Sequence, residues 1–270
     1  MLKDLLHWKK RPFIYSLLIT IGLLIYGLSM EYGNPKMYLY TLITTSMIFV
    51  LELISTIYLS KKLLIQYNLP SINKNDRIAN LVQHIVLPFS FFIGLSSFMF
   101  FYQYSIIKYL FLAASLVIFW ILFTNISAYY EDKFKIEIRT HGIYDSLTVL
   151  AYFGIFECII DITYYLNINF TYILVLLSIT TLIFCLTIIT RLFPANLLKI
   201  IPIIVFINVI IYFIGKYFGL ESLRISFLSS AVIYFFIAYA NHSKENTKSL
   251  GVIEEYILLF LIALVILIFN

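Results

Sequence analysis

The sequence has little charge. Only 12% of its 270 residues are Asp, Glu, Lys or Arg and 62% are hydrophobic, whereas soluble domains carry about a quarter of charged residues. Nowhere does a polar stretch run long enough to build a separate soluble domain. These two shortages exclude an ordinary soluble fold. They predict an all-α integral membrane protein, a polytopic bundle of transmembrane helices forming a single domain over residues 1–270.

Cysteine is equally scarce, with two residues, both inside apolar runs. Such cysteines are typical of small buried hydrophobic residues and give no basis for a disulfide framework or a zinc site. Zinc-binding helices, nucleophile elbows, phosphate-binding loops and dinucleotide fingerprints are also missing from the sequence. We therefore expect no cofactor, no metal and no assigned catalytic residue, and the sequence favours a protein that is not an enzyme.

What the chain does have is nine apolar runs, each near the length of about 20 residues that a helix needs to cross the hydrocarbon core. Their hydrophobicity is continuous rather than alternating, which excludes the strands of a transmembrane barrel. The eighth run is short and follows the polar Gly219-Leu-Glu-Ser222, so eight spans is the alternative. The runs cover residues 13–30, 38–60, 84–102, 109–128, 146–166, 171–190, 198–217, 224–240 and 251–269.

Positively charged residues are distributed unevenly between the segments that flank these runs. Of the 19 Lys and Arg residues, 14 lie before the first run or in the segments that follow the even-numbered runs, and Lys199 at the start of the seventh run makes 15 on this side. Because Lys and Arg accumulate in cytoplasmic loops, we expect a cytoplasmic N-terminus. No small-residue cleavage site follows the first run, so we expect it to stay as an uncleaved span. The short loops favour a prokaryotic plasma membrane.

The net charge of +5 has a membrane interpretation as well. Cytoplasmic Lys and Arg side chains meet anionic lipid head groups, so the expected partners are the bilayer and those head groups, not nucleic acid. A small-molecule substrate and an oligomeric state are not specified by the sequence.

Two of the predicted cytoplasmic loops carry a pattern. Within residues 61–83, the part from Asn75 onward is polar and is expected to be helical, leading into the third run. Asn75 is a candidate N-cap of this helix. Within residues 129–145, apolar and charged side chains alternate from Lys133 to Arg139, which is the spacing of a strand. A lone strand at a membrane surface has no partner, so we expect an interfacial segment with snorkelling Lys and Arg.

Three carboxylates interrupt the apolar runs: Glu52 in the second, and Glu157 with Asp161 in the fifth. A charged side chain at the bilayer centre costs about 2.5–3.5 kcal/mol on insertion scales. A spacing of four places Glu157 and Asp161 on one helix face, about 6 Å apart, and two such close acids do not both ionise in a low dielectric. We expect this face to point into the bundle and at least one of the two acids to be protonated.

No Lys or Arg lies deep in a run, so the expected partners of these acids are uncharged. Asn208 in the seventh run is the first candidate, and together with the three acids it would form a binding site or proton path. The other candidates are Asn125, tyrosine hydroxyls and the hydroxyl residues of the second run, Thr44, Thr45, Ser55 and Thr56.

Three functions fit these observations. Acids without fixed cations suit a small transporter-like protein, coupled to a proton or another cation. Neutral acids that hydrogen-bond between helices suit a membrane scaffold or assembly protein. A membrane-embedded enzyme acting on a lipid is the third, with a cytoplasmic site built from His84, Arg139, His141 and Asp145.

Overall fold

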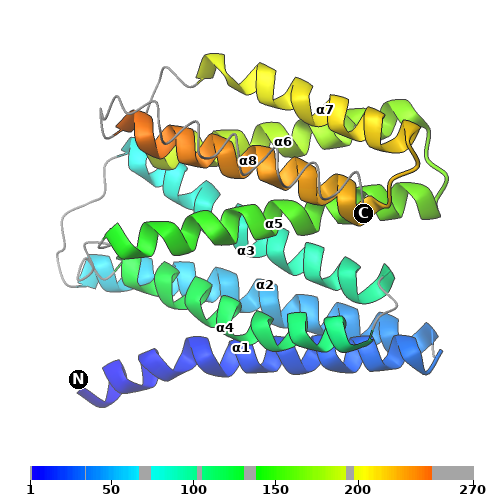
Figure 1. Ribbon diagram of the computed structural model, residues 1–270. Coiled ribbons are helices and arrows are strands. Elements are labelled where there is room, and N and C mark those ends of the chain that lie inside the picture. Colours follow the sequence, from blue (N-terminus) through cyan, green and yellow to red (C-terminus); the bar gives the residue numbers. More distant parts are fainter. Residues whose placement is uncertain are drawn as a thin grey trace. The chain divides into compact units, whose positions relative to one another are not determined.

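The computed structural model describes residues 2–33, 35–66, 74–101, 105–130, 138–192 and 198–244. Side chains are described for 11–33, 36–58, 85–101, 108–124, 126, 145–189 and 198–241. Within these ranges the chain forms eight α-helices (Figure 1). They are α1 (Leu2–Glu31), α2 (Pro35–Gln66), α3 (Lys74–Phe101), α4 (Ser105–Tyr130), α5 (Ile138–Tyr165), α6 (Phe170–Leu192), α7 (Ile201–Tyr217) and α8 (Ser222–Lys244).

Each of the first eight apolar runs coincides with a helix, while the ninth lies outside the described residues. Many of these residues are β-branched or aromatic and have modest helix propensity in water. They form helices here because a helix satisfies its own backbone polar groups in lipid.

Five of the described helices contain stretches long and apolar enough to cross a membrane, which supports a helical integral membrane protein. Shorter apolar stretches of 10–17 residues lie in α3, α4 and α7. The count of nine spans and the cytoplasmic N-terminus stay predictions. The five long stretches are Arg11–Glu31, Lys36–Tyr58, Asp145–Tyr165, Phe170–Ile189 and Ser222–Asn241.

The helix ends differ from the expectations at three places. The eighth run, the shortest of the nine expected spans, belongs to a helix with a 20-residue apolar stretch. The helical lead-in to the third run is confirmed, but α3 already begins at Lys74, so Asn75 lies inside the helix and is not its N-cap. Residues 138–145, expected as an interfacial segment, are the first two turns of α5.

Packing divides the chain into two compact units. The first holds α1, α2, α4 and the two ends of α3, before Ile78 and from Leu95. The second holds α3 from Ile78 to Gly94 and nearly all of α5 with α6, α7 and α8. A single membrane domain without a separate soluble part stays a prediction.

In the first unit α1 packs against both α2 and α4. Phe49 of α2 and Phe119 of α4 are fully buried, with ring centroids 6.0 Å apart. Gly22 lets α1 approach α2 closely, because an added Cβ would overlap the side chain of Thr45. The Thr20 and Ser115 hydroxyls, 3.5 Å apart, join α1 to α4.

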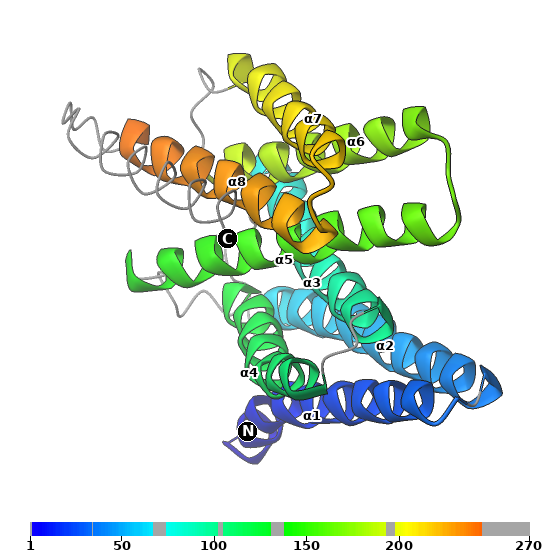
Figure 2. The ribbon, with the colours of Figure 1, turned by 45° about the vertical axis from the view of Figure 1, so that its right-hand side comes forward.

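In the second unit α8 lies alongside α5 and runs in the opposite direction (Figures 1 and 2). The α7–α8 connection is tight because Gly219 adopts a φ of 67°, in the left-handed region that favours glycine. The backbones of α3 and α5 also approach closely, since a Cβ added to Gly94 would lie 2.7 Å from the Cα of Gly154. These contacts fix α5, the helix that carries Glu157 and Asp161.

Candidate functional sites

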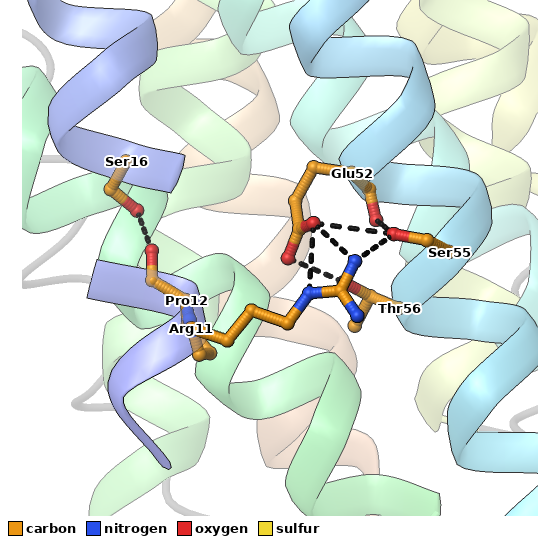
Figure 3. A network of polar contacts seen from close by, with 6 residues as sticks. All are labelled: Arg11, Pro12, Ser16, Glu52, Ser55 and Thr56. Atoms are coloured by element: carbon orange, nitrogen blue, oxygen red, sulfur yellow. Dashed lines mark hydrogen bonds and ion pairs between the residues drawn. The ribbon is translucent and has the colours of Figure 1, made fainter. Parts of the chain in front are cut away.

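Glu52, the acid of the second run, is held by an arginine. The Arg11 Nη2 and Nε atoms of α1 lie 2.9 and 3.2 Å from Glu52 Oε2 (Figure 3). Glu52 is 1% exposed, and the side chain of Arg11 is 26% exposed. The expectation that none of the three acids has a cationic partner is therefore wrong for Glu52, because Arg11 reaches into α2 from the turn before the first apolar run.

Hydroxyl groups complete this ion pair. Ser55 donates to Glu52 Oε2 at 3.2 Å, Thr56 donates to Oε1 at 3.0 Å, and Arg11 also donates to the Ser55 Oγ (Figure 3). This confirms Ser55 and Thr56 as partners of the acid. Both carboxylate oxygens are engaged, so Glu52 fastens α1 to α2 within the first unit.

Glu157 in the second unit is bonded differently. Its Oε1 accepts a hydrogen bond of 3.0 Å from the Ser222 hydroxyl at the first residue of α8. Its Oε2 is buried and finds no hydrogen-bond partner among the described residues. Ser226, one turn further along α8, lies beside this carboxyl group with its own Oγ buried and unpartnered in the described part of the chain. Glu157 is 5% exposed, so one of its two carboxyl oxygens is buried without a hydrogen bond from the part of the chain that the structure describes.

Asp161 lies one turn beyond Glu157 and is half-buried. The two acids share a face, as expected from their spacing, so a negative charge on one disfavours a negative charge on the other. The Ser222 hydroxyl lies beside Asp161 as well. A serine hydroxyl has one proton to donate, so the two carboxyl groups compete for it.

The start of α8 adds a second electrostatic feature. The N-terminus of a helix carries a partial positive charge, which stabilises nearby anions. Because Ser222 begins α8 and bonds to Glu157, the carboxyl group lies at that positive end. Burial favours the neutral acid, while the helix end and the Ser222 bond favour the anion.

Asn208, the expected partner on α7, is 1% exposed. Its Nδ2 donates to the Ile204 carbonyl of its own helix at 3.1 Å. Its Oδ1 lacks a hydrogen-bond partner among the described residues, and so do the buried Tyr212 hydroxyl on α7 and the Ser229 hydroxyl on α8. Every buried polar atom that lacks a partner among the described side chains lies on α5, α7 or α8 of the second unit.

The candidates for an enzyme site are only partly visible. Asp145 near the start of α5 is 9% exposed, and its Oδ2 accepts a hydrogen bond of 2.8 Å from Asn241 near the end of α8. The side chains of His84, Arg139 and His141 lie outside the described side chains. A site formed by these four residues stays a prediction.

Sequence reasoning missed the roles of Ser222 and Asn241. Ser222 precedes the eighth apolar run and looked like part of a polar turn, and Asn241 follows the same run. Nothing local marks either as a partner of an acid 65 or 96 residues away. Their pairing follows from the antiparallel packing of α5 and α8.

Comparison with protein-family models, curated proteins and solved structures found no match to this chain.

Proposed function

We propose that this chain is a transporter-like membrane protein that moves protons, or couples a proton or another cation to a small solute, with Glu157 as the proton-carrying group. The observation that carries the proposal is the Glu157 carboxyl group, which is buried with one oxygen bonded to Ser222 and the other unpartnered among the described residues. A purely structural carboxyl group tends to be fully hydrogen-bonded, as Glu52 is.

The surroundings of Glu157 suit an exchangeable proton. Ionisable residues inside a membrane are costly and mark ion and proton pathways. Burial opposes the charged form, whereas the α8 N-terminus and Ser222 stabilise it. A group in this balance takes up and releases a proton at a smaller cost than an acid held in one form, such as Glu52 beside Arg11.

A membrane scaffold is the second candidate, and the Arg11–Glu52 pair favours it. That network joins two helices and leaves no carboxylate oxygen unused. If Glu157 had the same role, its hydrogen bond to Ser222 would stabilise the packing of α5 against α8, and exchange of its proton would have no part in the function.

Two substitutions separate these functions. Glu157→Gln keeps an oxygen that accepts from Ser222 but removes the exchangeable proton, whereas Ser222→Ala removes the bond and keeps the acid. In liposomes with a pH gradient and a clamped membrane potential, the transport proposal predicts that Glu157→Gln loses proton flux while its thermal unfolding stays near wild type. Flux equal to wild type in Glu157→Gln contradicts the proposal and leaves the scaffold.

A further inference from the structure

One buried face of α8 changes character along its length. Ser222, Ser226 and Ser229 follow one another at intervals of four and three residues, and Ile233 and Phe236 continue the same stripe. Ser226, Ser229, Ile233 and Phe236 are all buried. The stripe is therefore polar in its first half and apolar in its second.

The polar half lies against the acids of α5. Ser222 donates to Glu157 at 3.0 Å, and Ser226 lies beside the same carboxyl group. Asp161, one turn closer to the end of α5, is half-buried, as is Ser222. Exposure thus decreases in order from Asp161 and Ser222 to Glu157 and Ser226.

The apolar half separates these groups from the other end of the helix pair. From Ile233 to Ala240 the stripe contains only fully or nearly fully buried apolar side chains, a distance of about 10 Å at 1.5 Å per residue. At the far end of the pair, Asn241 of α8 donates to Asp145 of α5.

We infer that Asp161, Ser222, Glu157 and Ser226 form a one-sided proton entry path, open at the end where α8 begins and closed toward the other end by Ile233 and Phe236. The inference rests on the proposed function and adds the direction of access and the order of the groups. Under the predicted topology the open end faces outward.

The proposed proton transfer runs through the Ser222 hydroxyl and leaves that hydroxyl uncharged. Asp161 takes a proton from water at the open end. As this proton passes to Ser222 Oγ, the Ser222 hydroxyl proton passes to Glu157 Oε1, so Ser222 ends the step as a neutral hydroxyl and Asp161 as an anion. Rotation of the hydroxyl restores the starting arrangement.

Other charged and titratable groups at this end of the unit set the local field. Tyr212 and Lys216 lie on α7, Glu221 precedes α8, and Arg224 is in its first turn. The Lys216 Nζ lies 5.1 Å from the Phe170 ring centroid and 5.9 Å from that of Tyr164. On the described part of α3, the contact with this face of α5 is the uncharged Gly94.

Thiol labelling measures access without measuring transport. Ser222→Cys, Ser226→Cys and Asn241→Cys are reconstituted separately and treated with a membrane-impermeant methanethiosulfonate reagent on one side of the vesicle or the other. Wild type is the background control, because its two cysteines are buried and buried thiols react poorly. Asn241→Cys reports which side the far end of α8 faces.

We expect Ser222→Cys and, more slowly, Ser226→Cys to react only from the side opposite to Asn241→Cys. Reaction of Ser226→Cys from the Asn241 side, at a rate equal to that from the Ser222 side, overturns one-sided access. In a flux assay Ser222→Ala should slow proton uptake by on the order of 10²-fold, the size of effect that a positioned proton-transfer group has. Unchanged uptake in Ser222→Ala overturns the order of transfer.

The two proposals fail in different ways. If flux depends on Glu157 but Ser226→Cys reacts from both sides, the entry path is wrong and the transport function stands. If labelling is one-sided but Glu157→Gln transports protons like wild type, the transport function is wrong.

Discussion

Arg11 of α1 and Glu52 of α2 form an ion pair in which the carboxylate is buried, with Nη2 2.9 Å from Oε2. Removing one partner of a buried pair costs about 3–5 kcal/mol, because the other charge is left uncompensated. We expect Arg11→Met alone to lower the thermal unfolding temperature in detergent markedly. The double variant Arg11→Met with Glu52→Met should recover most of the loss, because apolar residues replace both charges. A double variant less stable than the single one contradicts the pairing.

Gly94 and Gly154 bring the α3 and α5 backbones into direct contact. Since a Cβ on Gly94 would lie 2.7 Å from backbone atoms of Gly154, Gly94→Ala should destabilise the protein by about 1–3 kcal/mol, as other overpacked sites do. Gly27→Ala is the matched control, because among the described residues its Cβ would meet the Met99 Sδ alone, at an ordinary contact distance of 3.6 Å. Thermal unfolding should leave Gly27→Ala at or above wild type, and equal losses in both variants would show that close backbone contact is not the cause.

Tyr152 and Thr181 join α5 to α6 by a buried hydrogen bond of 2.8 Å. The two ways of breaking it should differ. Tyr152→Phe leaves a Thr181 hydroxyl that still bonds to the Leu177 carbonyl, so we expect a loss near 0.6 kcal/mol. Thr181→Val leaves the buried Tyr152 hydroxyl without this partner and should lower the free energy of unfolding by about 1–3 kcal/mol. Equilibrium unfolding of the two variants checks the order, and the reverse order contradicts it.

The sequence predicts the helices well because each apolar run has to satisfy its own backbone in lipid. It also predicts that Glu157 and Asp161 share a face, since this depends only on the helical repeat. The partners of Glu52 and Glu157 could not be predicted in this way, because they depend on how the helices pack. Arg11 precedes the first apolar run and reaches Glu52 only because α1 and α2 pack together. Ser222 meets Glu157 only because α8 runs antiparallel to α5.

Infrared difference spectra recorded across a pH titration of the reconstituted protein test most directly whether Glu157 exchanges a proton. A protonated carboxyl group has a carbonyl stretch that a carboxylate lacks. We expect a band of this kind that disappears as the pH rises, is missing in Glu157→Gln and persists in Glu31→Gln, which removes an exposed acid at the end of α1. Identical titration spectra for folded wild type and folded Glu157→Gln would contradict the assignment of Glu157 as the proton carrier.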